Sequence, residues 1–501
     1  MKGPRQVQLF GVNGRTGRYA LPPLSTDDLE VAALHAVSRP GLVAEARRTL
    51  VDREVASFQE VLGPTLGASV RAGRGRRRPP GSDLPEWEVA RRGWGVVFPA
   101  GEPRLPAIRE ALAPLLALRR RQVAAVSERH FRELEYRSGE LLFDFRRRYR
   151  ATPGIADPRK IPGYLLLVGG PQAIPFDFQT EMAAQEYAVG RLDFDSIEEL
   201  ALYAENVAQA EGQEAPRDGA RRIAFFAPEH PDDSLSEESA RHLAAPLADA
   251  CALPGDGWTV ERIFGERATK RRFSELLARE APPAILFTAG HGAVFESGDE
   301  RQAADQGALV CADWQGPEAA AISEDDYFSA DDLGSDLRLG RMIAFHFACC
   351  SLGVPAQNDL HRAGLPIPER LAPDDLVARL PRRMLAQGAL AAIGHLDLVF
   401  AYSFREGRSD EEPDADPPPL YDRCLKDLLR GRPVGEATSP FRACYRARLV
   451  ELAELRQRAL ERREVQAATL WDIEAACHDA RYYAVFGDPA VRLAAPAESG
   501  S

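Results

Sequence analysis

The sequence predicts an α/β protein whose mostly parallel sheet is sandwiched by helices. Three observations favour this class. From about residue 160, short apolar runs alternate with amphipathic segments of helix length. Two of the apolar runs, 284–288 and 342–348, lead into residues that can carry chemistry, His291 and Cys349. The chain has 501 residues, 45% of them hydrophobic, which is enough for two or three domains.

The expected elements follow in order along this part of the chain. The expected strands are 164–168, 222–227, 258–263, 284–288, 342–348 and 389–394. The expected helices are 197–211, 236–250, 269–280 and 374–387. Strands alternating with helices indicate parallel pairing with helices on both faces of the sheet.

Residues 1–150 precede this alternation, and we expect them to form an α/β accessory domain of unknown role. Gly11, Gly14 and Gly17 are spaced as in a dinucleotide-binding loop, which would make an oxidoreductase a third reading of the chain. Such a loop must open a helix near Gly14, whereas Pro22 and Pro23 follow shortly afterwards. We therefore expect a glycine-rich turn and no cofactor.

Three segments have the composition of surface loops. Residues 74–80 are basic and are either a solvated loop or a site cut by a protease that prefers basic residues. Residues 407–419 are acidic and proline-rich, so they should be exposed and tolerant of cleavage. Residues 292–340 form an insertion between His291 and Cys349.

Charge and cysteine content exclude several classes of partner and compartment. A net charge of −12 does not favour binding to nucleic acid or to an anionic membrane. Seven cysteines at irregular spacing form neither a disulfide framework nor a metal-binding pattern. No signal peptide or bilayer-spanning segment is apparent. We expect a cytoplasmic protein without a metal site.

His291 and Cys349 are the candidate catalytic pair. The carboxyl ends of parallel strands meet at one edge of a sheet, so both side chains should emerge there as a dyad. Cys349 would attack a carbonyl carbon and His291 would protonate the leaving amine. The backbone amides of Gly292 and Cys349 would stabilise the oxyanion. Cys350 is the alternative nucleophile, but alternation along the strand sends it the opposite way.

Several motifs resemble those of caspase-like cysteine peptidases, and more closely those of the gingipain-type branch. Gly290-His291-Gly292 and Ala348-Cys349 match the pattern around the dyad. The other matching motifs, in family order, are Tyr164 to Gly170, Tyr187 to Leu192 with the helix-like segment at 198–200, and Val485 to Ala490. The resemblance implies a first subdomain at 160–215 and a catalytic domain at 216–493, with inserted loops at 292–340 and 407–419.

The same resemblance implies further site residues. A carboxylate that orients the histidine is expected after the strand at 222–227, where Glu229 is the candidate. Carboxylates that would bind a basic P1 side chain are expected about ten residues later, at Glu237 and Glu238.

The predicted function is that of a regulated or latent cysteine endopeptidase. It would act on protein or peptide substrates, and a regulatory protein partner is compatible with the resemblance. The alternative is a catalytically silent scaffold of the same fold that binds a protein partner.

Overall fold

The computed structural model places most of the chain. It describes residues 6–7, 9–21, 24–25, 83–152, 156–185, 187–212, 221–252, 257–318, 321–362, 365, 367–405, 416–461 and 465–493. The predicted loop at 74–80 and residues 407–415 of the predicted loop at 407–419 lie outside these ranges.

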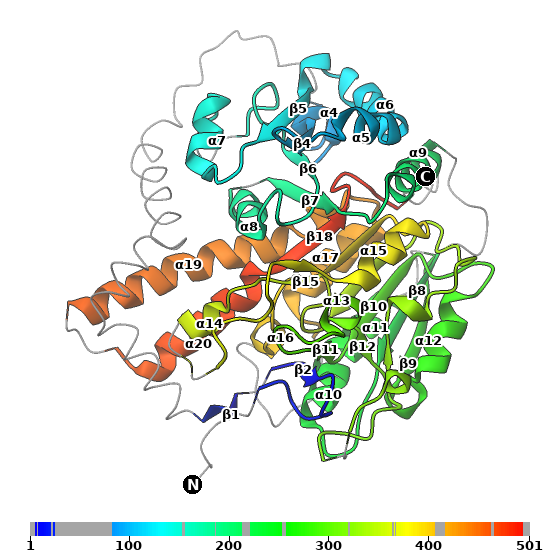
Figure 1. The fold of residues 1–501 in the computed structure, drawn as a ribbon, viewed down its shortest axis with the longest axis vertical. Helices are drawn as coiled ribbons and strands as arrows, with labels where there is room; N and C mark the ends of the chain where they lie inside the picture. The colour runs from blue at the N-terminus through cyan, green and yellow to red at the C-terminus, as the bar shows by residue number, and fades with distance from the viewer. Residues whose placement is uncertain are drawn as a thin grey trace.

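A ten-stranded sheet runs through the molecule (Figure 1). In spatial order its strands are β5 (Phe131–Tyr136), β4 (Trp94–Pro99), β6 (Tyr164–Val168), β7 (Ala188–Leu192), β18 (Tyr483–Gly487), β17 (Ala391–His395), β14 (Ile343–Phe347), β10 (Ile285–Ala289), β8 (Arg222–Ala227) and β9 (Thr259–Phe264). All neighbours are parallel except β17 and β18. The sheet therefore consists of two parallel halves that run in opposite directions, and the predicted α/β class is confirmed.

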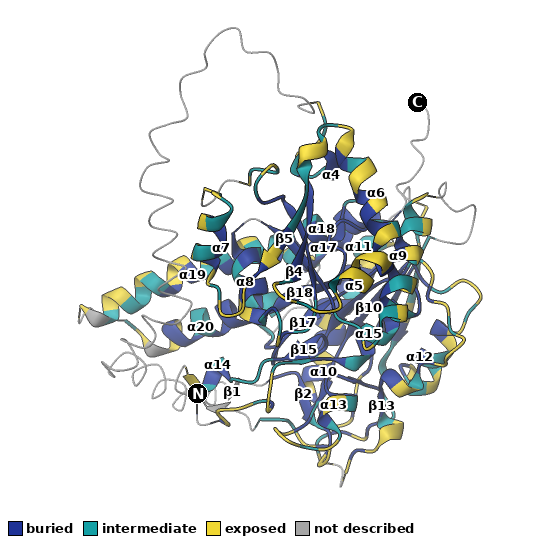
Figure 2. Cartoon of the chain, turned by 45° about the horizontal axis from the view of Figure 1, so that its top comes forward, coloured by how far each residue is buried: buried dark blue, intermediate teal, exposed yellow. Residues whose placement is uncertain are grey.

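Helices cover both faces of this sheet. The α-helices of the described residues are α4 (Val89–Arg92), α5 (Leu105–Ala111), α6 (Ala113–Ala124), α7 (Leu142–Arg148), α8 (Phe176–Ala184), α9 (Ile197–Gly212), α10 (Ser234–Glu238), α11 (Ala245–Cys251), α12 (Lys270–Leu277), α13 (Gln302–Asp305), α14 (Asp359–Arg362), α15 (Arg379–Ala386), α16 (Tyr402–Arg405), α17 (Pro419–Leu429), α18 (Val434–Ala437), α19 (Ser439–Leu460) and α20 (Ala467–Arg481). Every residue of the central strands β6, β7, β18, β17, β14 and β10 is buried, as the dark interior in Figure 2 shows. Since successive side chains point to opposite faces, burial of all of them means that both faces are covered.

Four short strands form a second sheet at one end of the molecule. They are β13 (Tyr327–Phe328), β12 (Leu309–Val310), β11 (Gly292–Val294) and β2 (Gly11–Asn13). Three of them come from the predicted insertion at 292–340, and β2 comes from the N-terminal segment. Two pairs complete the strands: β1 (Gln6–Val7) with β3 (Leu24–Ser25), and β15 (Gly353–Val354) with β16 (Leu376–Val377).

The predicted accessory domain at 1–150 is not a separate unit in the described part of the chain. Strand β4 pairs in parallel with β6 over Trp94 to Val97, so the predicted boundary at residue 150 falls within one continuous half of the sheet. Strand β2 lies at the opposite end of the molecule, paired with β11. The paired strands are far apart in the sequence in both cases, so local sequence patterns do not predict their pairing.

The motif at 485–490 joins the two halves of the sheet. Asp488 is fully buried and accepts hydrogen bonds from Trp94 Nε1 at 2.9 Å and Arg119 Nε at 2.7 Å. Gly190 leaves room for the carbonyl oxygen of Gly487, which a Cβ at position 190 would overlap. These contacts are structural, because they tie the residue after β18 to α6 and β4, and Gly190 lets β7 and β18 approach each other.

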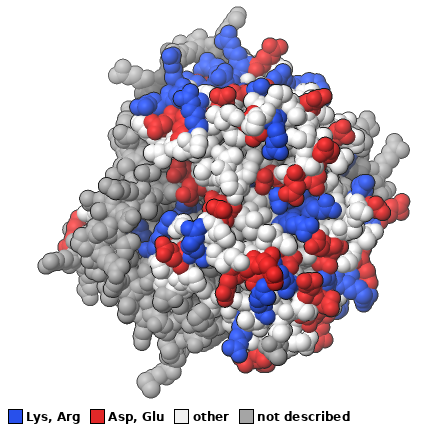
Figure 3. Space-filling view, viewed as in Figure 1, with Lys and Arg blue, Asp and Glu red and all other residues white. Residues whose placement is uncertain are grey.

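The outer surface carries both signs of charge. On the face in Figure 3, acidic and basic side chains are interspersed. Some surface charges form ion pairs, such as Arg15 with Glu300 at 3.0 Å. Among the described residues, no helix combines the length and the apolar character needed to cross a bilayer.

Candidate active site

His291 and Cys349 emerge from neighbouring strands at the same edge of the sheet. Strand β10 pairs in parallel with β14, with Ala289 opposite Phe347. His291 and Cys349 each lie two residues beyond this pair, and both are buried. The structure thus brings together the two residues that the sequence selected. Residues that lie the same number of positions beyond a pair of aligned parallel strands come side by side.

Gly292 holds the two strand ends in close contact. Its backbone lies so near Cys349 that a Cβ at position 292 would overlap the carbonyl oxygen of Cys349. Gly290 N also donates to Phe347 O at 3.1 Å. A glycine is required at position 292 because any side chain would push the histidine strand away from the cysteine strand.

Two backbone amides converge on one oxygen beside Cys349. Gly292 N and Cys349 N both donate to the carbonyl oxygen of Phe10, each at 3.3 Å. A pair of amides directed at one carbonyl oxygen is the arrangement that stabilises an oxyanion during acyl transfer. The occupant comes from the N-terminal segment, which the sequence did not place here.

The histidine is held by Asp233. Its Nε2 lies 2.8 Å from Asp233 Oδ2, and Tyr19 donates its hydroxyl to Asp233 Oδ1 at 2.7 Å. Burial would raise the pKa of Asp233, but the charge and hydrogen bond of His291, with hydrogen bonds from Tyr19 and Ser236, hold it well below its usual range. Asp233 is therefore ionised, and it orients His291 so that Nδ1 is the free nitrogen.

His291 Nδ1 is buried and has no hydrogen-bond partner among the described residues. The rings around it are aromatic: Phe10 at 5.7 Å, Trp314 at 5.7 Å and Tyr19 at 6.0 Å between centroids. Since buried ring nitrogens are normally paired, an unpaired one here fits a group that must exchange a proton.

The assignment of Glu229 as the orienting carboxylate is corrected by this geometry. Glu229 is exposed, and its pKa is raised by partial burial and then by the charge of Glu237. Both side chains line a surface hollow together with Asp232 and Ser234. Asp233, four residues beyond Glu229, bonds His291 instead, because the turn after β8 and the start of α10 direct it inwards.

The signal for Asp233 was present in the sequence in a different form. Asp233 is the N-cap of α10 and accepts a hydrogen bond from Leu235 N at 3.3 Å. An aspartate directly before Ser-Leu-Ser-Glu-Glu is a typical helix start, which fixes its side chain in a defined direction. Glu238 is half-buried and Glu237 exposed on the same helix.

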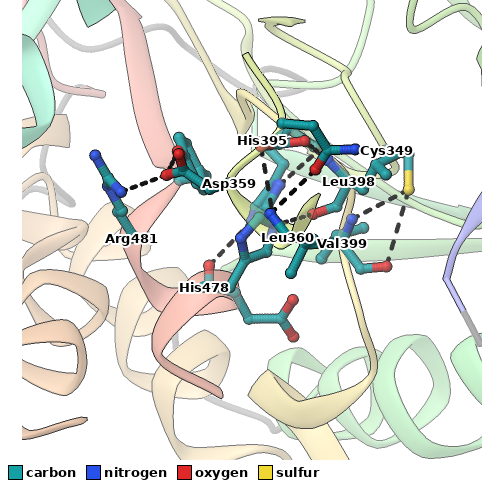
Figure 4. A network of polar contacts seen from close by, with 12 residues as sticks. Cys349, Asp359, Leu360, His395, Leu398, Val399, His478 and Arg481 are labelled. Atoms are coloured by element: carbon teal, nitrogen blue, oxygen red, sulfur yellow. Dashed lines mark hydrogen bonds and ion pairs between the residues drawn. The ribbon is translucent and has the colours of Figure 1, made fainter. Parts of the chain in front are cut away.

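The thiol of Cys349 is bonded to the backbone of Val399. Val399 N donates to Cys349 Sγ at 3.1 Å, and the thiol lies 3.8 Å from Val399 O (Figure 4). Burial, followed by the neighbouring Cys350, raises the pKa of Cys349 well above its usual value. The resting thiol is therefore protonated, and its activation requires a base within reach.

Cys350 has a different environment. It adopts a left-handed backbone conformation, with a φ of 55°, and its amide donates to Asp397 O at 2.8 Å. Its amide is therefore committed to the β17 side of the strand end, whereas that of Cys349 meets Phe10. Of the two cysteines, Cys349 is therefore the one whose amide takes part in the converging pair.

A buried polar network fixes the loop that carries Val399. Asp479 Oδ1 accepts from Phe400 N at 2.6 Å, and His478 Nε2 lies 3.1 Å from Leu398 O. Figure 4 shows this network, which reaches from Cys349 and Val399 to the pair of Asp359 and Arg481. The loop is thereby held rigidly beside the thiol.

The glycines of the N-terminal segment do not form a dinucleotide loop. Gly14 and Gly17 belong to a tight turn between Asn13 and Arg18, whose backbones are joined by a 2.8 Å hydrogen bond. Because a hairpin and not a helix follows Gly14, the amides needed to hold a pyrophosphate are missing here. The expected glycine-rich turn is confirmed.

Comparison with known proteins gives likenesses of fold only. No family model matches the chain, and no curated protein matches it. A solved structure described as a protease is 12% identical with a TM-score of 0.47; the match covers 80% of this chain and 78% of that one. Gingipain R, an Arg-specific cysteine proteinase, is 14% identical with a TM-score of 0.45, again over 80% and 78%.

The pro- and mature domains of RgpB from Porphyromonas gingivalis give 12% identity and a TM-score of 0.44, over 80% of this chain and 79% of that one. The gingipain-type resemblance expected from the sequence is thus found among solved structures.

Proposed function

We propose that the chain is a cysteine endopeptidase that hydrolyses peptide bonds in protein or peptide substrates. The observation that carries this proposal is the convergence of the Gly292 and Cys349 amides on one carbonyl oxygen. A carbonyl bound there lies beside the Cys349 thiol, and His291 stands on the neighbouring strand with one nitrogen unpaired. Nucleophile, base and oxyanion donors are the three parts that acyl transfer requires.

Each residue then has a defined role. His291 Nδ1 takes the thiol proton as Cys349 Sγ attacks the carbonyl carbon, and the ionised Asp233 stabilises the imidazolium that forms. The two amides bind the oxyanion. His291 then returns the proton to the leaving amine, and water hydrolyses the thioester.

The proposal is tested with fluorogenic peptides bearing Phe, Leu, Arg, Lys or Asp at P1. We expect Cys349→Ala to lower kcat/KM by about 10³-fold or more, because no other group supplies the nucleophile. Cys350→Ala is the matched control, since it removes an adjacent buried thiol, and we expect nearly wild-type cleavage. Loss of activity in Cys350→Ala with retention in Cys349→Ala would reverse the assignment.

The identity of the preferred peptide decides the role of the acidic hollow. If Arg or Lys peptides are cut fastest, Glu237 and Glu238 are the candidates for P1 binding. A basic side chain would need a carboxylate near it, because burial of an unpaired charge is costly.

A catalytically silent scaffold is the second candidate function. It is favoured by the complete burial of Cys349, with Phe10 filling the space in front of the amides. The scaffold is supported if no peptide is cut either by the wild type or by Phe10→Ala, which loses the buried ring and keeps the backbone carbonyl.

A further inference from the structure

The N-terminal segment at residues 9–20 enters the active site as an extended strand and returns as a hairpin. Strand β2 pairs in parallel with β11, with Gly11 opposite Gly292. Gly14 N donates to Val294 O at 2.9 Å, and Ala20 N donates to Gly11 O at 2.8 Å. The segment is therefore held in fixed register on the strand that directly follows His291.

The backbone of Phe10 is bound at both of its polar atoms. Its carbonyl oxygen accepts from the two amides described above, and its N–H donates to Val399 O at 3.0 Å. The same Val399 carbonyl lies next to the Cys349 thiol. Binding of the N–H and the carbonyl on either side of one α-carbon fixes that residue directly before the bond that the thiol can reach.

The side chain of Phe10 fills an aromatic pocket. It is fully buried, and its ring lies 4.9 Å from Phe347 in an edge-on arrangement, 5.7 Å from His291 and 6.0 Å from Phe404. These three neighbouring rings are all aromatic. Such a pocket favours an aromatic side chain and disfavours a cationic one that brings no carboxylate with it.

The following residue places the peptide bond beside the sulfur. A Cβ at Gly11 would lie 3.3 Å from Cys349 Sγ, so the sulfur sits against the backbone on the C-terminal side of Phe10. The glycine leaves room there because it has no side chain. The Phe10 carbonyl oxygen therefore lies at the two amides, and the sulfur lies against the side-chain face of Gly11, the residue that follows the bond.

We propose that the first substrate of the enzyme is its own Phe10–Gly11 bond, and that the site selects an aromatic residue before the cleaved bond. This inference rests on the proposed peptidase function. Cys349 Sγ forms a thioester with the Phe10 carbonyl carbon as the C–N bond to Gly11 breaks. The thiol proton passes through His291 to the Gly11 nitrogen, which becomes an amine, and water releases residues 1–10 with a free carboxylate.

The same contacts keep other substrates out as long as Phe10 occupies the site. Leu9 and Phe10 are buried, and β1 within the same fragment pairs with β3 on the other side of the cut. The cleaved fragment would therefore stay bound in a native preparation. Self-cleavage must be measured under denaturing conditions.

The test is a time course of intact mass, under denaturing conditions, on the purified full chain. We expect the wild type to lose residues 1–10 and to begin at Gly11, at a rate independent of protein concentration because the bond lies in its own site. Cys349→Ala should keep its full mass, and Cys350→Ala should be processed like the wild type. Cleavage of Cys349→Ala at the same bond would overturn the proposal, since another protease would then be responsible.

The aromatic pocket is tested by changing the residue before the bond. Phe10→Tyr should be cut nearly as fast as the wild type, whereas Phe10→Ala and Phe10→Arg should be cut at least about 10-fold more slowly. Equal rates for Phe10→Arg and the wild type would overturn the aromatic preference.

Failure of this inference is distinguishable from failure of the peptidase proposal. A wild-type chain that keeps its N-terminus but cleaves added peptides, in a manner that needs Cys349, refutes self-cleavage and leaves the peptidase intact. A chain that cuts neither itself nor any peptide, also as Phe10→Ala, refutes both.

Discussion

Strands β10 and β17 lie in the same half of the sheet, and each leads into a buried histidine. His291 follows β10 and His395 is the last residue of β17. The two rings use their nitrogens differently. His291 Nε2 bonds the carboxylate of Asp233. The two nitrogens of His395 face the carbonyl oxygens of Asp397 at 2.9 Å and Asp479 at 3.0 Å.

This difference separates the proposed catalytic histidine from a structural one. Burial lowers the pKa of His395 to about 4, against the effect of its backbone hydrogen bonds, so its ring is neutral near pH 7. Its neutral ring carries one N–H and can donate to only one of these two carbonyl oxygens, but both of its nitrogens face the backbone. His291 keeps Nδ1 free, with an ionised carboxylate behind it. Burial alone would not have told the two apart.

The carboxylates beside these histidines differ in the same sense. Asp233 has a lowered pKa because its partners favour the charge. Burial raises the pKa of Asp397 well above its usual value, with its hydrogen bond from Leu398 N opposing the shift. Asp397 Oδ2 has no hydrogen-bond partner among the described residues. Asp233 supports the chemistry in the proposed mechanism, whereas Asp397 belongs to the network that holds the Val399 loop.

Replacing the two histidines should give the largest contrast. We expect His291→Ala to lower kcat/KM by about 10²- to 10⁴-fold, because the general acid and base is lost. His395→Ala should mainly lower the free energy of unfolding, by about 2–4 kcal/mol, because buried carbonyl groups lose their partner and a cavity opens. Peptide kinetics and urea unfolding on both variants measure the two effects.

The assignment of His291 as catalytic and His395 as structural would be wrong if the two variants showed each other's effects. A His395→Ala protein that unfolds like the wild type but cannot cleave peptides would make His395 part of the chemistry. Rates are to be expressed per folded molecule, since the loop that carries Val399 depends on the network around His395.

The carboxylate behind the reactive histidine should have the next largest effect. Asp233→Asn keeps the size of the side chain but removes the charge that stabilises the imidazolium, and we expect a loss of about 10- to 100-fold in kcat/KM. Glu229→Gln is the matched control, because it removes a carboxylate four residues earlier that is exposed. Equal losses in the two variants would return the orienting role to Glu229.

These residues also mark how far the sequence could lead. Apolar runs predicted β6 and β8 to the residue, and the equal offsets of His291 and Cys349 beyond parallel strands followed from the fold class. The carboxylate was misplaced by four residues, because its direction depends on a helix cap and on Tyr19, more than 200 positions away. The order of parallel strands predicts which strand ends lie side by side. It does not predict which side chain from a distant segment completes the site.

The N-terminal segment shows the same limit more strongly. The glycines at 11–17 predicted a turn, and the structure has one, but its position depends on pairing between β2 and β11. These strands are about 280 residues apart, and each has only three residues. Strand pairs this short and this far apart in the sequence leave no periodic pattern. The sequence therefore did not predict that Phe10 occupies the site.

The smallest expected effect separates the two carboxylates by the sign of their pH dependence. The folded-state pKa of Asp397 lies above its unfolded value of about 3.9, so the folded chain binds more protons and stability falls as the pH rises past that value. Asp397→Asn removes this decrease in stability with rising pH. Its free energy of unfolding relative to the wild type should rise by at least about 1 kcal/mol between pH 5 and pH 8.

Asp233→Asn should show no such change with pH in the same urea titrations. A lowered folded-state pKa gives stability that is fully present above about pH 5 and is lost only as the pH falls through the folded value. The variant should therefore be less stable than the wild type by a constant amount from pH 5 to pH 8. If both variants followed the same pH course, the two carboxylates would share one charge state, and the distinction between an ionised partner of His291 and a protonated member of the Val399 network would be lost.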